Sequence, residues 1–202
     1  MSKIDFKKTL SCYKAKKGKI EIIEVPELQY LMVDGHGDPN TSKEFKDAVE
    51  TLFPMAYKLK FTSKIDLKKD YAVMPLEGLW WAKDMEKFTS ARDKSDWDWT
   101  LMIMTPDWIT KEMFEQAKVA VKDKNLSKIN EIRLETLKEG KCVQTLHVGS
   151  FDDEGPMLKH IHTEFIPQNG LKMVQKHHEI YFSDFRKVSP DKMKTILRQP
   201  VI

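Results

Sequence analysis

The sequence has few of the features that mark secreted, membrane-spanning or metal-binding proteins. Only two of its 202 residues are cysteine, Cys12 and Cys142, and they form no CxxC pair. The opening residues Met1–Phe6 are too polar for a secretory signal, and no apolar run approaches the roughly 20 residues of a transmembrane helix. These absences predict a cytoplasmic protein with two unpaired thiols and no membrane partner.

The sequence also has no large excess of positive or negative charge. The chain carries 34 Lys and Arg residues against 31 Asp and Glu residues, which leaves a net charge of +3. The lysines between Lys14 and Lys19 are interpreted as a short solvated basic run. A balanced and interspersed charge argues against an electrostatic nucleic-acid binder, so no nucleic-acid partner is expected.

The common catalytic and cofactor motifs are missing as well. There is no HExxH motif, P-loop or nucleophile elbow. Gly35-His36-Gly37 lacks the third glycine of a dinucleotide fingerprint and is interpreted as a turn. His160 and His162 lie two apart on a predicted helix, and the adjacent His177 and His178 point to opposite sides of a strand. We therefore expect neither a metal site nor a cofactor.

What the sequence does contain is a pattern that occurs twice. Residues 30–39 and 144–156 are each a β-rich run that breaks at glycine, passes an aspartate and a proline, and opens a helical pattern. Each helix is followed by a strand that carries a glutamate and aromatic residues. Two similar halves that meet at a pseudo-twofold axis create a cleft, and such clefts favour ligand sites.

In the first half, strands are predicted at residues 20–25 and 28–35. Thr41 followed by Glu44 is typical of a capping box, and an apolar stripe then extends to Leu59. Pro54 is expected to kink or break this helix. The remaining predictions are a β-like run at 71–81 with an irregular edge or bulge at Pro75 and Gly78, a loop at 84–95, and a strand at 96–105.

In the second half, a helix is predicted to begin at Thr110. Strands at 131–137 and 141–150 are joined by a tight hairpin-like turn at 138–140. Pro156 lies in the first turn of a helix that Gly170 ends. A last strand is predicted at 177–183, and Ser189-Pro190 opens a terminal helical segment through Leu197.

These elements predict an α+β fold in which duplicated strand-helix-strand-strand halves form a mainly antiparallel sheet. The helices are expected on one face, with a ligand cleft between the halves. Residues 1–202 are predicted to be a single domain, with a lead-in at 1–19, a first half at 20–108, a connecting helix at 109–128 and a second half at 129–202.

Glu179 is the first candidate for chemistry. In the strand at 177–183, period-two geometry places Glu179 on the same side as Tyr181 and Ser183. Such a carboxylate is either solvated on an outer face or buried among aromatic rings. Burial would raise its pKa and make it a base or a cation partner near neutral pH.

Tryptophans near Glu77 are the second candidate. Four of the five tryptophans lie between Trp80 and Trp99. Such rings can stack on planar or cationic ligands, or they can form a hydrophobic core. Because side chains alternate along strands, at least two of the four are expected in the core.

Several motifs together resemble the GyrI-like family, whose fold also forms the effector-binding domains of BmrR-type multidrug regulators. The residues that carry the resemblance are Val33–Pro39, Val73–Trp81, Leu146–Pro156, Glu179–Asp184 and Lys192–Val201. The resemblance covers nearly the whole chain. It is closest to a stand-alone bacterial branch with the signature Pro-Leu-Glu-Gly-Leu-Trp-Trp. No helix-turn-helix domain precedes the fold, so a one-chain transcription factor is not expected.

This resemblance implies a cleft that binds bulky, aromatic or cationic small molecules, with Glu179 at the position of a ligand-facing glutamate. A similar group of stand-alone members hydrolyses the strained cyclopropane of cyclopropanoid DNA-alkylating compounds. On that basis Glu179 would orient or deprotonate water, and Tyr181 or Tyr71 would hydrogen-bond the ligand carbonyl. The predicted catalytic residues are Glu179 and Tyr181, and the predicted ligand-binding residues are Tyr71, Glu77, Trp80, Trp81, Trp97, Trp99 and Phe182.

Three functions stay open at this point. The first is a hydrolase that opens a cyclopropane ring and protects the cell. The second is a non-catalytic protein that binds or sequesters aromatic drugs. A third and weaker interpretation is a protein-interaction module of the gyrase-inhibitor kind, although no docking patch is visible in the sequence. The expected partner is a small aromatic ligand, and a protein partner is not identified.

Overall fold

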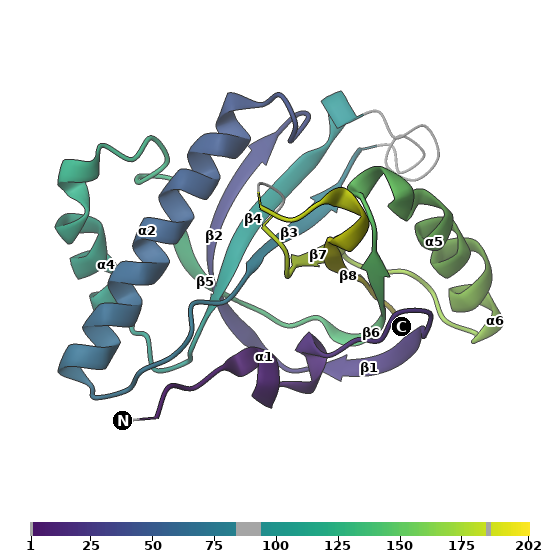
Figure 1. Cartoon of the computed structure of the whole chain (residues 1–202), viewed down its shortest axis with the longest axis horizontal. Helices are drawn as coiled ribbons and strands as arrows, with labels where there is room; N and C mark the ends of the chain where they lie inside the picture. Colours follow the sequence, from purple (N-terminus) through teal and green to yellow (C-terminus); the bar gives the residue numbers. More distant parts are fainter. Residues whose placement is uncertain (1, 84–93, 185–186) are drawn as a thin grey trace.

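A single eight-stranded sheet organises the molecule. The computed structural model describes residues 2–83, 94–184 and 187–202. The strands follow the order β1-β6-β8-β7-β3-β4-β2-β5, and all neighbours are antiparallel (Figure 1). The predicted α+β fold with an antiparallel sheet is confirmed. The strands are β1 Glu21–Val25, β2 Leu28–His36, β3 Leu76–Trp81, β4 Asp98–Thr105, β5 Arg133–Leu137, β6 Gly140–Val148, β7 His177–Tyr181 and β8 Lys194–Pro200.

The two halves exchange their first strands. β1 pairs with β6 of the second half, and β5 pairs with β2 of the first half. The prediction of a hairpin at 138–140 is therefore wrong, because β5 and β6 do not pair with each other. The chain runs on through this turn, and the side chain of Glu139 points into the interior, where it accepts a hydrogen bond from Arg198.

Helix α2, Lys43–Asp66, is unbroken although Pro54 lies within it. The predicted break does not occur, because buried residues on both sides of Pro54, such as Leu52 and Met55, hold the helix against the sheet. Their burial offsets the roughly 3 kcal/mol that an interior proline costs. Its N-cap is Ser42, which accepts a hydrogen bond from the backbone N–H of Phe45, one residue later than predicted.

The remaining helices follow the predicted positions more closely. Thr110 caps α4, Lys111–Ala120, by accepting a hydrogen bond from the N–H of Met113. In the second half, α5 (Gly155–His160), a π-helical turn (Ile161–Phe165) and α6 (Ile166–Gln168) form one continuous segment. At the N-terminus lies the short α1, Phe6–Thr9. None of the helices in the described ranges is long and apolar enough to cross a membrane.

Two strand predictions need correction. The terminal segment is a 3-10 turn at Pro190–Lys192 followed by β8, not a helix, because β8 lies between β6 and β7 and hydrogen-bonds to both. The β-like run at 71–81 is a strand only from Leu76, and it is central in the sheet and not at an edge. Pro75 precedes the strand, so no ladder hydrogen bond is lost. Residues 84–93 of the predicted loop lie outside the described residues.

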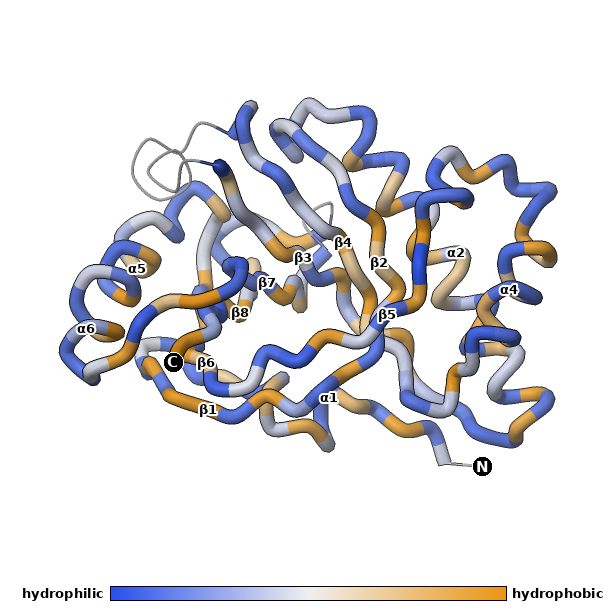
Figure 2. Tube along the Cα trace, turned by 180° about the vertical axis from the view of Figure 1, so that it is seen from behind, coloured by the Kyte–Doolittle hydropathy of each residue, from blue (hydrophilic) through white to orange (hydrophobic). Residues whose placement is uncertain are grey.

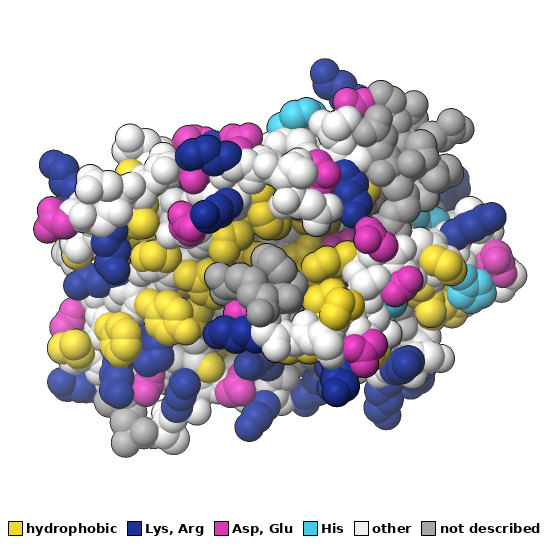
Figure 3. All heavy atoms as spheres, turned by 45° about the horizontal axis from the view of Figure 1, so that its top comes forward, with side chains coloured by type: hydrophobic (Ala, Val, Ile, Leu, Met, Phe, Trp, Pro, Cys, Tyr) yellow, Lys and Arg dark blue, Asp and Glu magenta, His cyan; other side chains and the backbone are white. Residues whose placement is uncertain are grey.

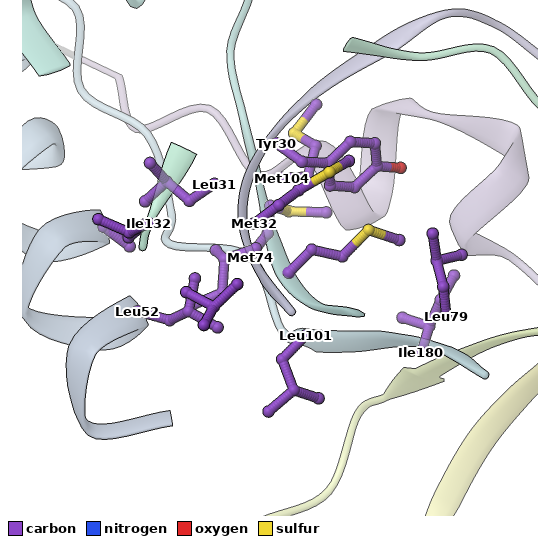
Figure 4. Packing of buried hydrophobic residues seen from close by; sticks show 14 of the residues in the cluster. Tyr30, Leu31, Met32, Leu52, Met74, Leu79, Leu101, Met104, Ile132 and Ile180 are labelled. Carbon is purple, nitrogen blue, oxygen red and sulfur yellow. The ribbon is translucent and has the colours of Figure 1, made fainter. Parts of the chain in front are cut away.

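The two faces of the sheet have different covers. Helices α2 and α5 cover one face, here called the cavity face, whereas the N-terminal segment around Tyr13 covers the other. Apolar residues are dense along β2 and β4 and alternate with polar ones along α4 and α5 (Figure 2). Figure 4 shows the resulting core, in which Leu31, Leu52 and Leu101 pack between α2 and the sheet. The residues on the opposite face of the sheet are Tyr30, Met32, Met104, Leu79 and Ile180.

Candidate functional site

A cavity of about 760 Å³ lies between the two halves, bounded by α2 on one side and by the segment from Phe151 into α5 on the other. Residues of β3 and β7 form its floor. Apolar side chains line a hollow on this side of the molecule (Figure 3). The aromatic and apolar lining residues are Phe45, Val49, Phe53, Val73, Met74, Leu76, Trp80, Trp97, Phe151, Leu158, Tyr181 and Phe182.

A chain of hydrogen bonds crosses the cavity floor from β3 to β7. The indole Nε1 of Trp80 donates to the hydroxyl oxygen of Tyr181 at 2.8 Å. That hydroxyl donates in turn to Oε2 of Glu179 at 2.7 Å. Because both Glu179 and Tyr181 lie on the cavity face of β7, the strand itself brings them together. The arrangement fixes one orientation of the carboxylate.

Gly78 makes this chain possible. It lies opposite Glu179 in the β3–β7 ladder. A Cβ atom at position 78 would lie 2.6 Å from Nε1 of Trp80 and 3.2 Å from the hydroxyl of Tyr181. The indole of Trp80 therefore lies back over the space that Gly78 leaves empty. The glycine of the Glu-Gly-Leu-Trp-Trp sequence has a direct structural role at the cavity floor.

Aromatic contacts hold these rings in place. The ring of Trp80 stacks on Phe45 of α2, with centroids 6.2 Å apart, and meets Trp97 edge-on at 5.7 Å. Phe151 meets Tyr181 edge-on at 5.6 Å. These contacts pack the aromatic rings of the cavity walls against one another in both halves.

Two carboxylates are buried at the cavity. Glu179 is 9% exposed and Glu154 is 1% exposed, and both belong to the lining. Burial, followed by the nearby charge of Glu179 and its hydrogen bond, raises the pKa of Tyr181 well above its usual value. The phenol therefore stays protonated near neutral pH and remains a donor to Glu179. Buried carboxylates beside aromatic rings attract cations.

Two histidines lie near Glu179, the first next to its carboxylate and the second next to the first. Nε2 of His177 is 3.4 Å from Oε1 of Glu179, and the ring of His162 meets that of His177 edge-on with centroids 6.0 Å apart. Burial, together with the charge of His177, lowers the pKa of His162 to about 3, so that His162 is neutral. His162 belongs to the π-helical turn, an irregularity that is frequent near functional sites.

Five of the nine predicted site residues line the cavity, namely Glu179, Tyr181, Trp80, Trp97 and Phe182. The structure brings these together from β3, β7 and the segments next to β4 and β7. The other four, Tyr71, Glu77, Trp81 and Trp99, are not part of the lining.

Glu77 lies on the face of the sheet opposite the cavity. It is fully buried, accepts a 2.6 Å hydrogen bond from the hydroxyl of Tyr13, and lies 2.9 Å from Nε2 of His178. The same imidazole contacts Glu139, whose other oxygen accepts a hydrogen bond from Arg198. Glu77 is thus a member of a closed ionic network and does not face the cavity.

The other three predicted residues outside the lining, Trp99, Tyr71 and Trp81, pack against other parts of the protein. Trp99 is fully buried, and its ring occupies the space that Gly35 leaves open. The ring of Tyr71 is 1% exposed and packs edge-on against Trp108. Trp81 lies on the opposite face from Trp80, and the ammonium of Lys176 lies 3.2 Å from its ring centroid.

Sequence reasoning missed the α2 and α5 walls of the cavity. Phe45 and Val49 belong to the predicted apolar stripe but were not among the predicted site residues, although both line the cavity and Phe45 stacks on Trp80. Phe151 and Glu154 follow the second glycine break, at Gly149. The repeat in the sequence could have indicated these lining residues, because the segment after each glycine break forms one side of the cleft. In the described part of the chain, no cluster of three or more His, Cys, Asp or Glu side chains is arranged to hold a metal ion.

An aromatic cavity with buried carboxylates, set between two similar halves of an antiparallel sheet, is the kind of site that a small-molecule-binding protein has. Over residues 18–201 the chain matches the family described as the GyrI-like small molecule binding domain. The chain belongs to this family, as the resemblance of its motifs implied.

Solved structures agree with this assignment. An uncharacterized conserved protein from Listeria innocua is 42% identical, with a TM-score of 0.89, and the match covers 99% of this chain and 100% of that protein. A Listeria innocua protein described as a hydrolase is 41% identical, with a TM-score of 0.85 and the same coverage. The C-terminal domain of EcmrR shares the fold, at 10% identity and a TM-score of 0.56, over 91% of this chain and 97% of that domain. No protein of curated function matches the chain.

Proposed function

We propose that this protein is a hydrolase that binds a flat aromatic compound in the cavity and opens its strained cyclopropane ring with water. The observation that carries the proposal is the hydrogen-bonded chain Trp80–Tyr181–Glu179 on the floor of an aromatic cavity. The 41% identity to a Listeria protein described as a hydrolase, over the full length of that protein, supports a hydrolytic reaction.

The reaction needs a ligand that is held in place, a general base and the exclusion of bulk water. The rings of Trp80, Trp97 and Phe45 would hold the flat ligand and displace bulk water, which strengthens the remaining electrostatic interactions. Glu179 would take a proton from a water molecule as the water oxygen bonds to a cyclopropane carbon. The broken carbon–carbon bond would leave its electron pair on the conjugated ring as a phenolate, which then takes up the proton.

Tyr181 acts as a positioning residue in this proposal. Its hydroxyl proton is donated to Glu179, and its oxygen accepts from Trp80. The hydroxyl therefore fixes the direction of the carboxylate and is not free to donate to the ligand carbonyl at the same time. Tyr71, the alternative partner for that carbonyl, is packed against Trp108 and does not line the cavity.

A non-catalytic role is the second candidate, and one observation favours it. Glu154 and Glu179 are both buried among aromatic rings, an arrangement that also suits tight binding of an aromatic cation without reaction. A sequestering protein would use the same cavity and release its ligand unchanged.

The test is incubation of the protein with a duocarmycin-type cyclopropane compound, followed by mass spectrometry for the water adduct. We expect more ring-opened product than protein, and Glu179→Gln should lower the rate by roughly 10²–10⁴-fold. Quenching of tryptophan fluorescence by the compound should be retained in this variant, because the aromatic walls are intact.

Glu50→Gln is the matched control, because Glu50 also lines the cavity but its side chain is 60% exposed at the rim. Its rate should equal that of the unmodified protein. Recovery of intact compound after denaturation, with fluorescence quenched on mixing, would replace the hydrolase by the sequestering protein. An unchanged rate in Glu179→Gln would remove the carboxylate from the mechanism.

A further inference from the structure

Apolar side chains gather on the outer side of α2 and α4, away from the cavity. Among the described residues, eight large apolar side chains are exposed, and five of them belong to this region. They are Tyr57 (49%), Phe61 (50%), Ile65 (62%), Leu67 (41%) and Val119 (74%). Tyr57, Phe61 and Ile65 follow one another at four-residue steps and so form one stripe along α2. Single exposed apolar residues are ordinary, but a contiguous stripe indicates an interaction surface.

The stripe borders a groove between the two helices, here called the α2–α4 groove. Its volume is about 430 Å³. One wall comes from α2 and the other from the end of α4 and the residues after it. The lining residues are Phe53, Pro54, Tyr57, Lys58, Phe61, Ala120, Val121 and Lys124.

The charges at the groove are of one sign. Lys58 and Lys124 are the charged members of its lining, and both are exposed. The ammonium of Lys60 also lies 4.6 Å from the ring centroid of Phe61, but it is buried and paired with Asp70 at 2.9 Å, so Lys58 and Lys124 supply the accessible charge. An apolar groove with a cationic border complements a partner that is apolar along one line and acidic beside it.

We propose that the α2–α4 groove docks an amphipathic helix of a partner protein, with apolar side chains in the groove and Asp or Glu residues against Lys58 and Lys124. Helices bind grooves of this kind through anchors at three- and four-residue steps, the spacing that Tyr57, Phe61 and Ile65 also have. This surface is separate from the proposed chemistry of the cavity.

Two other occupants fit less well. In a symmetric dimer the same patch would face itself, which would bring the like-charged Lys58 and Lys124 of both copies into one interface. A flat anionic membrane would also contact the neighbouring exposed acidic residues Glu112, Glu115 and Asp123, which it would repel. A narrow acidic helix avoids both conflicts.

The groove also adjoins the cavity. Phe53 lines both of them, so one side chain of α2 separates a docked helix from the bound small molecule. A partner in the groove would therefore contact a residue that also lines the cavity.

The test uses two fluorescent helical peptides that carry leucine at three- and four-residue steps and differ only in their flanking residues, glutamate in one and lysine in the other. Fluorescence anisotropy with the full-length protein should show binding of the acidic peptide, weakened by added salt, and little binding of the basic one. Phe61→Ser should lower the affinity for the acidic peptide by roughly tenfold. The double variant Lys58→Glu with Lys124→Glu should reverse the preference between the peptides.

Ile22→Ser is the matched control, because Ile22 is 45% exposed on β1 at the other edge of the sheet. It should leave both affinities unchanged. All substitutions are at exposed or half-exposed positions, and thermal melts followed by circular dichroism would verify folding. Absence of binding, or equal binding of both peptides, would overturn the proposal. A concentration-dependent dimer lost in Phe61→Ser would instead assign the groove to a second copy, and Phe61-dependent binding to anionic phosphatidylglycerol vesicles would assign it to a membrane.

Discussion

At the scale of single residues, two glycines decide where two tryptophans lie. Gly78 makes room for the indole of Trp80 above the cavity floor, and Gly35 makes room for the ring of Trp99 in the core. Both are strand residues, where glycine is otherwise unfavourable because it adds no packing and loses more conformational freedom. The closeness of the rings explains why a side chain is absent at both positions.

Alanine at these two positions should have different effects. Gly78→Ala would place Cβ 2.6 Å from Nε1 of Trp80, displace the indole, and break its hydrogen bond to Tyr181. We expect the affinity for the cyclopropane compound, measured by tryptophan quenching, to fall roughly tenfold, as for loss of a well-placed anchor. An unchanged affinity would mean that Trp80 does not hold the ligand.

Gly35→Ala is the comparison, because its Cβ would lie 2.0 Å from the ring of Trp99, in the core and outside the cavity lining. Overpacking of this kind costs about 1–3 kcal/mol. The thermal midpoint should fall while affinity per folded molecule stays the same. If Gly35→Ala also lowered the affinity for the ligand, the distinction between cavity and core tryptophans would be wrong.

At the scale of elements, α2 carries three different surfaces. Leu52, Met55 and Leu59 pack on the sheet, Phe45 and Val49 line the cavity, and Tyr57 with Phe61 border the α2–α4 groove. Apolar residues therefore lie on more than one side of α2, beyond the stripe that packs on the sheet. This explains why its sequence indicated a helix but did not distinguish core from cavity.

The cap of α4 can be tested directly. Thr110 accepts a hydrogen bond from the N–H of Met113 at 3.2 Å, so Thr110→Ala leaves that donor without its side-chain partner. The free energy of unfolding, measured with urea, should fall by about 1 kcal/mol. Thr110→Ser keeps the hydroxyl and should stay close to the unmodified protein. Equal losses in both variants would show that the methyl group, not the cap, matters.

At the scale of the whole molecule, a buried ionic network connects the two halves on the face opposite the cavity. His178 of β7 contacts Glu77 of β3 and Glu139 of the β5–β6 turn, each at 2.9 Å. Arg198 of β8 donates to Glu139 at 2.7 Å, and its other nitrogen donates to the carbonyl of Cys12. All the charged members are at most 4% exposed, so removal of one leaves uncompensated charge in the interior.

The protonation of His178 should make the stability depend on pH. Burial alone would lower its pKa, but the charge of Glu139 and hydrogen bonds to Glu139 and Glu77 raise it above 6.5. Its stabilising contribution is therefore complete below pH 6.5 and is lost as the pH rises through the folded-state pKa. Burial would raise the pKa of Glu139, but His178 and Arg198 hold it at about 2, so that its contribution is present above pH 4.5 and is lost toward pH 2.

His178→Gln should lower the free energy of unfolding by about 3 kcal/mol at pH 6, the cost of breaking a buried pair. The difference between the two proteins should shrink at alkaline pH, where the histidine of the unmodified protein loses its proton. Urea unfolding across the pH range measures this, with the exposed His36→Gln as control. A difference that stays constant with pH would mean that His178 is neutral in the network.

The sequence predicted the antiparallel α+β fold, the repeat and most helix positions, because these depend on local periodicity and on turn residues. It also predicted that His177 and His178 face opposite sides, and the structure places one near Glu179 and the other near Glu139. Strand alternation could not tell which face of β3 holds the cavity, so Glu77 and Trp81 were grouped with Trp80 although they point the other way.

What the sequence determined by itself is therefore local: where strands and helices form, and which residue types accompany each glycine break. Only the tertiary structure decided that β1 and β5 exchange halves, that the segment 194–200 is a strand, and that Phe45 and Phe151 meet the same cavity as Glu179. The physical reason is that strand pairing and cavity walls join residues far apart in the chain, and their energies depend on packing partners that no local pattern contains.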